Sequence, residues 1–183
     1  MMNVLFITIL FLVILICIFT VFFILIYNNF QDSIIRINEV EGKIDECLRK
    51  KYDLLNRSVT IVKGNIKIKS EIFDEVVRLR SRKINNFDLE RKLVNGYQEL
   101  LKIKTENKEL ESSEEINKAI DEIKEIDNKL TILKDYYDNN ITIYNKSIKI
   151  FPSNIVASIC KYKEKVFFDK KDMTDDDIND FKL

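Results

Sequence analysis

The feature that most restricts the fold of this chain is its first apolar segment. From Val4 to Tyr27 the sequence holds 24 residues without a charged side chain. A helix rises about 1.5 Å per residue and a bilayer core needs roughly 20 apolar residues, so this run can cross a membrane. No Lys or Arg precedes it and no small-residue cleavage site follows it, which argues against a cleaved signal peptide. We therefore expect a transmembrane anchor over residues 1–29.

Basic residues near the ends of the run predict its orientation. Lys and Arg favour the cytoplasmic side of a span. None precedes the run, whereas Arg36, Lys43 and 49–51 follow it. We therefore expect a single-pass protein of the cell membrane, with its N-terminus outside and its C-terminal body in the cytoplasm. Cys47 and Cys160, the two cysteines of the body, form no disulfide framework and fit a reducing compartment.

The body has the composition and the periodicity of long helices. The whole chain contains only 3 Gly and 1 Pro, whereas an all-β body would need many turns. Apolar residues recur at steps of three and four from Phe30 to Ile66, and again from Ile116 to Ile148. These apolar stripes are typical of amphipathic helices, and they are wider than a strict coiled-coil seam. They favour an all-α fold in which long helices pack antiparallel as a bundle after the transmembrane helix.

Local signals predict where these helices begin and end. Gly64–Ser70 predicts a break, and Thr105–Ser113 predicts a polar connector. The residue before a proline avoids the α region, so a helix should end before Pro152. Side chains that can cap a helix start are found at Asp88, at Ser112 in a capping box with Glu115, and at Ser153.

Charge is balanced overall and uneven along the chain. Lys and Arg number 30 and so do Asp and Glu, so no basic field exists and we expect no nucleic-acid partner. Residues 43–92, which include Arg49, Lys50 and Lys51, lean basic, whereas residues 99–127 lean acidic. We interpret both as solvated helix faces that complement each other across one bundle. The alternative is a basic strip that touches anionic lipid headgroups.

The side chains of common catalytic sites are missing or scattered. The chain has no His, no Cys-x-x-Cys and no phosphate-binding glycine loop. Glu114–Glu115 and Asp175–Asp177 are interpreted as solvated charge rather than metal ligands. We therefore predict a protein that is not an enzyme, with no catalytic, cofactor-binding or metal-binding residues.

Two segments carry a resemblance to a known family. The first runs from Ile44 to Val59 and continues to Val62-Lys63-Gly64; the second contains Tyr136-Tyr137-Asp138, Tyr144-Asn145, Phe151-Pro152-Ser153-Asn154-Ile155-Val156-Ala157 and Val166-Phe167-Phe168. In order and spacing these motifs resemble the LemA family of bacterial membrane proteins, although Lys51 stands where the family has Arg. The polar residues 169–183 are expected to form an acidic tail. The resemblance implies an antiparallel, up-and-down body of four long helices over 30–168, on a single span over 1–29. It implies no reaction.

The motif positions also have a structural interpretation. They are Asp45, Leu48, Tyr52, Asp53, Leu55, Gly64, Tyr137, Tyr144, Asn145, Phe151, Pro152, Asn154 and Ala157. The leucines and tyrosines fall on the apolar stripes, which predicts packing. Asp45, Asp53 and Asn145 are expected to satisfy buried hydroxyl or backbone groups, and Phe151-Pro152 is expected to plug the bundle end.

Three hypotheses about function follow. The first is a LemA-like membrane scaffold whose helical body binds another protein of the envelope or cytoplasm. The second is a membrane-proximal tether or sensor that associates with itself as a homo-oligomer through its stripes. The third is an enzyme that uses Lys and Asp side chains at a site no motif identifies.

Overall fold

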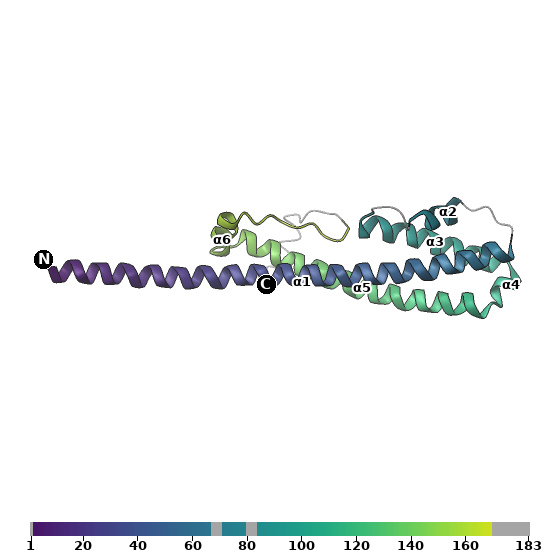
Figure 1. Cartoon of the computed structure of the whole chain (residues 1–183), viewed down its shortest axis with the longest axis horizontal. Coiled ribbons are helices and arrows are strands. Elements are labelled where there is room, and N and C mark those ends of the chain that lie inside the picture. The colour runs from purple at the N-terminus through teal and green to yellow at the C-terminus, as the bar shows by residue number, and fades with distance from the viewer. Residues whose placement is uncertain (1, 67–70, 80–83, 170–183) are drawn as a thin grey trace. The chain divides into compact units, whose positions relative to one another are not determined.

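A computed structural model describes residues 2–66, 71–79 and 84–169. Every element in these residues is helical (Figure 1), which confirms the all-α fold class and the long N-terminal helix. The elements are α1 (Met2–Asn65), α2 (Glu71–Arg78), α3 (Asn86–Glu106), α4 (Lys108–Glu111), α5 (Glu114–Lys149) and α6 (Ser153–Cys160). Apart from Asp169, the predicted tail lies outside the described residues.

Helix α1 is continuous from the apolar run into the residues that follow it. No proline interrupts its backbone hydrogen bonds, and Gly42 lies at an exposed position in open space. The helix ends at Asn65, inside the predicted break. Its apolar part is not buried, and among the described residues α1 is the helix long and apolar enough to cross a membrane.

The chain divides into two compact units. One unit joins the part of α1 up to Asn38 with Asp138–Phe167, which holds the end of α5 and all of α6. We call it the membrane-proximal unit, because it contains the apolar run. The other unit joins Glu39–Tyr137 with Phe168, and thus holds the rest of α1 and α5 together with α2, α3 and α4. We call it the helical unit.

The core of the helical unit contains side chains of both predicted stripes and further ones of α2 and α3. Its fully buried side chains include Ile44, Leu48, Leu55, Val59 and Val62 of α1, Phe73 of α2, Leu93 and Leu100 of α3, and Ile116 and Ile123 of α5. Gly96 of α3 lies where three helices approach one another. A Cβ atom there would come within 2.6 Å of Cγ2 of Val76 and 2.9 Å of Cδ2 of Leu55. A side chain at this position would therefore push α2 and α1 away from α3.

The membrane-proximal unit has a core of its own that is aromatic at one end. Phe30 of α1 is buried and packs edge-on against Tyr144 of α5, with ring centroids 5.9 Å apart. Tyr162, just after α6, packs on the same Phe30 ring at 4.9 Å. Val156 and Ala157 bury the inner face of α6.

Three capping predictions were wrong, and each error has a local reason. Asn85, not Asp88, caps α3, and its side chain accepts a hydrogen bond from the Asp88 backbone N–H. Ser112 lies at the end of α4, inside the segment predicted as a connector, and its hydroxyl donates to backbone carbonyls of that helix. Ser153 is the first residue of α6 rather than its cap, and its hydroxyl donates to the carbonyls of Ser147 and Ile150. Serine hydroxyls can donate to carbonyls as readily as they cap N–H groups.

Candidate functional site

A groove on the helical unit gathers three of the motif residues. Tyr52 and Asp53 lie about two helical turns from Asp45 on the same side of α1. Arg49 completes that side, and Leu79, Ile84 and Leu89 form the opposite, apolar side. The groove has a volume of about 440 Å³. We call it the motif groove.

The polar groups of the motif groove are near solvent and only loosely fixed. Arg49 Nε donates to Asp45 Oδ2 at 2.8 Å, one turn apart on α1. Both side chains are exposed enough for water to screen the pair, so it contributes little to stability. The Tyr52 hydroxyl donates to the Val77 carbonyl across 3.5 Å, and Asp53 is exposed. Arg49 and Asp45, held to each other by this screened pair, can exchange it for contacts with an incoming protein segment.

Beside the groove, one cation is fully buried, contrary to the prediction that the basic residues of 43–92 are solvated. Lys51 is 1% exposed, and its Nζ donates to Asp127 Oδ1 at 2.5 Å. The same Nζ lies 5.8 Å from the centre of the Tyr97 ring, within the range of a cation–π contact. Burial raises the pKa of Tyr97. The ammonium group of Lys51 on α1 thus contacts a side chain of α3 and a side chain of α5.

The sequence contained a signal for Lys51 that the composition argument missed. Lys51 follows Leu48 by three residues and precedes Leu55 by four, so it lies on the apolar stripe itself. A charged residue on a stripe predicts a buried partner. The acidic-leaning segment supplies that partner, as the expected complementarity between basic and acidic segments implies.

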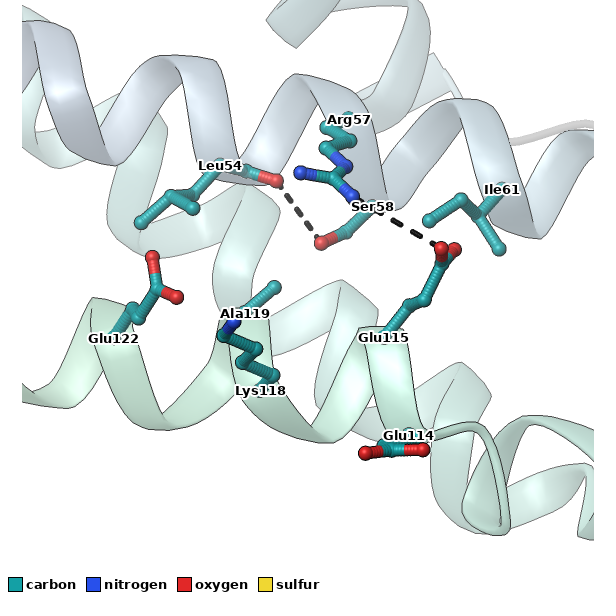
Figure 2. A pocket seen from close by; sticks show the side chains of 9 residues that line it. All are labelled: Leu54, Arg57, Ser58, Ile61, Glu114, Glu115, Lys118, Ala119 and Glu122. Atoms are coloured by element: carbon teal, nitrogen blue, oxygen red, sulfur yellow. Dashed lines mark hydrogen bonds and ion pairs between the residues drawn. The ribbon is translucent and has the colours of Figure 1, made fainter.

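A second, more polar groove lies between α1 and α5 in the helical unit (Figure 2). Leu54, Ser58 and Ile61 line it on α1, and charged residues of α5 surround it: Glu114, Glu115, Lys118 and Glu122. Its volume is about 260 Å³. Figure 2 shows Arg57 reaching toward Glu115 at 4.0 Å, and the Ser58 hydroxyl turned back to donate to the Leu54 carbonyl. The serine is thereby held by its own helix, and the remaining groups are solvated charges.

The motif residues at the C-terminal end hold a loop onto α5. Asn145 is 0% exposed, its Nδ2 donates to the Lys165 carbonyl at 2.7 Å and its Oδ1 accepts from the Lys165 N–H at 2.9 Å. Tyr144 is buried beside it, and burial raises the pKa of its hydroxyl. One amide side chain thus satisfies both backbone groups of a residue twenty positions further on.

The other motif positions are divided between core and surface. Leu48, Leu55 and Ala157 are buried, whereas Tyr137 and Pro152 are half-buried, and Gly64, Asn154 and Phe151 are exposed. Phe151 is 75% exposed, so the expectation that Phe151 and Pro152 plug the bundle end was wrong for the phenylalanine. Tyr137 packs edge-on against Phe168 in the helical unit. The thirteen positions therefore lie in both units and form no single cluster.

Metal-ligating groups do not gather in the part of the chain that the structure describes. Among residues 2–66, 71–79 and 84–169, no three Cys, Asp or Glu side chains are placed to share an ion. Cys17, Cys47 and Cys160 are free.

Comparison with known proteins identifies the family but adds no characterised relative. No curated protein matches the chain. The model of the LemA family matches residues 41–179, which is more than half of the sequence. The match includes the motif groove, Lys51, Asn145 and α6. The chain therefore belongs to the LemA family.

Proposed function

We propose that this protein is a membrane-anchored helical scaffold that binds another protein beside the bilayer. The observation that carries the proposal is the continuity of α1. Its exposed apolar part suits a lipid environment, and the same helix then supplies core residues to the body without a break. Such a helix would hold the body close to the membrane surface. The N-terminus would lie outside the cell and the body in the cytoplasm, as the position of Arg36 and Lys43 after the run favours.

The body of the scaffold would be an antiparallel helical bundle. Two ion pairs between α1 and α5 support this arrangement: Lys51 pairs with Asp127, and Arg57 pairs with Glu115. Arg57 follows Lys51 by six residues in α1, whereas its partner Glu115 precedes Asp127 by twelve residues in α5. This is the order that antiparallel neighbours produce.

The docking surface would be the motif groove. Its two carboxylates, Asp45 and Asp53, flank one arginine and face an apolar side. A partner segment that places an apolar side chain beside a basic one would complement both. The chain would act by binding rather than by catalysis, and its ligand would be a protein rather than a cofactor.

Site-specific photo-crosslinking tests this proposal in native membranes. A benzophenone amino acid at Asp53, in the full-length protein, should give one discrete product with a heavier protein. The same reagent at Glu125, an exposed position of α5 in the same unit, is the matched control and should not give it. A product at Asp53 of twice the chain mass would instead favour the self-associating tether. No product at Asp53 beyond that of the control would contradict docking at the motif groove.

A further inference from the structure

Helix α6 and the turn before it expose a group of large apolar side chains. They are Ile150 at 46% exposed, Phe151 at 75%, Ile155 at 51% and Ile159 at 63%. We call them the α6 patch. Ile155 and Ile159 lie one turn apart on the same face of α6, whereas Val156 and Ala157 face the core. Single exposed apolar residues are ordinary, but four large ones within ten residues mark this segment as a candidate contact with a non-aqueous partner.

Both ends of α6 lie beside the part of α1 where the apolar run ends. Ser153, at its start, lines a depression with Ile26 and Asn29. Tyr162, just after its end, packs on Tyr27 with ring centroids 6.4 Å apart. Gln31 Nε2 donates to the Tyr162 hydroxyl at 2.6 Å. Within this unit, α6 is thus held beside α1 at residues 26–31 (Figure 1).

The length of the apolar run determines how deep in a bilayer the α6 patch would lie. Its 24 residues span about 36 Å as a helix, and the hydrocarbon core of a bilayer is about 30 Å thick. When the run crosses a membrane, its last residues therefore lie at the level of the headgroups. The α6 patch lies at the same level.

The charge around α6 fits the same environment. Residues 146–165 contain one acidic side chain, Glu164, which pairs with Lys149 at 3.2 Å. They contain five lysines: Lys146, Lys149, Lys161, Lys163 and Lys165. An apolar face bordered by lysines is the pattern of helices that lie in the interface of membranes with anionic lipids.

We infer that the α6 patch inserts into the headgroup region of a bilayer that contains anionic lipid, as a second membrane contact besides the span. This inference rests on the proposed anchoring by α1, because the span determines how far α6 lies from the bilayer. Phe151, Ile155 and Ile159 enter the boundary of the acyl chains, while Lys161 and Lys163 contact lipid phosphates. The two contacts together fix how the membrane-proximal unit sits on the membrane.

The chain has no tryptophan, so a single introduced one reports the surroundings of the patch. The full-length Phe151→Trp protein is reconstituted into vesicles of phosphatidylcholine and phosphatidylglycerol that carry bromine at shallow or deep acyl positions. We expect the emission of the F151W reporter to shift to the blue. We also expect the shallow bromines to quench it at least twofold more strongly than the deep bromines. The control is Ile132→Trp, an equally exposed position on α5 in the helical unit. Quenching of the two reporters to the same low extent would overturn the inference.

Three further measurements separate the possible outcomes. Replacing Lys161 and Lys163 with Gln in the F151W protein should lower quenching in the anionic vesicles and leave it unchanged in pure phosphatidylcholine. A reporter shielded in native membranes but not in lipid vesicles would show that a protein covers the patch, and would overturn the lipid contact. Extraction at alkaline pH distinguishes the two proposals. Release of the protein from the membrane contradicts the anchor, whereas a retained protein with an unquenched reporter contradicts the α6 contact alone.

Discussion

The buried ion pair between Lys51 and Asp127 predicts opposite results when its two ends are removed. In D127N the ammonium group stays buried, now beside a neutral amide. Loss of one partner of a fully buried pair costs about 3–5 kcal/mol. Because the Asp127 side chain is 37% exposed, water reaches the gap, and we expect D127N to cost about 2–3 kcal/mol of unfolding free energy.

In K51M the buried charge itself is removed. Methionine has a similar length and fills the space between Leu48 and Leu55. The carboxylate of Asp127 is then left near solvent, where it is hydrated. Replacing a buried charge with an apolar side chain of similar volume is often neutral or stabilising, so we expect K51M to lie within about 1 kcal/mol of the wild type.

Urea unfolding of the full-length protein in nanodiscs, followed by circular dichroism, measures both variants. Thermal unfolding should agree, since 1 kcal/mol shifts the midpoint by about 2–4 °C in a domain of this size. The control is K50M. Lys50 forms an exposed pair with Glu46 one turn away, and its loss should leave the urea midpoint unchanged. The reasoning is refuted if K51M destabilises the protein as much as D127N does.

Four further variants test other parts of the structure. Gly96→Ala should destabilise the helical unit by about 1 kcal/mol, because overpacking outweighs the gain in helix propensity, whereas Gly42→Ala in open space should stabilise it by a similar amount in the same urea assay. Asn145→Ala should cost about 2 kcal/mol through its two lost hydrogen bonds, and hydrogen exchange should show the Lys165 amide losing its protection; a protected amide would contradict this. Burial raises the pKa of Tyr144, so the folded state holds that proton more tightly than the unfolded state, and stability should fall as the pH rises above about 10. Tyr144→Phe should flatten that alkaline loss, and an unchanged pH profile would count against it.

The periodicity of the sequence was sufficient to predict the two longest helices. Stripes at steps of three and four lie on α1 and α5, and the break after Gly64 and the stop before Pro152 follow from local chemistry. The short α4 was not predicted, because it lies inside the segment expected to be a connector. The capping residues were harder to predict. A serine hydroxyl or an asparagine amide can bond to several backbone groups nearby, and the choice depends on the path of the chain.

The sequence alone could not predict most of the residue pairs and clusters that form the sites. Lys51 and Asp127 are 76 positions apart, so nothing local marks them as partners. Asn145 was expected to satisfy buried hydroxyl or backbone groups, but its partner, Lys165, could not be named. The exposure of Phe151 was missed because a phenylalanine beside a proline at a helix end resembles a core plug. The exposure of Phe151 can be interpreted as a lipid contact only once the structure places α6 beside the end of the apolar run.

In the proposed membrane-anchored protein, the unbroken α1 would also make the span torsionally rigid. Phe30 and Ile37 point into the membrane-proximal unit, and no proline or glycine lies between Tyr27 and Asn38 to absorb a twist. One helical turn corresponds to 3.6 residues, so the azimuth of every side chain in the span is fixed relative to that unit. A neighbouring transmembrane helix that gripped one side of the span would thereby determine which way the packed aromatic residues face. If α1 crosses the membrane as proposed, rotation about the helix axis would then be a mechanical signal that this chain could carry across the headgroup layer.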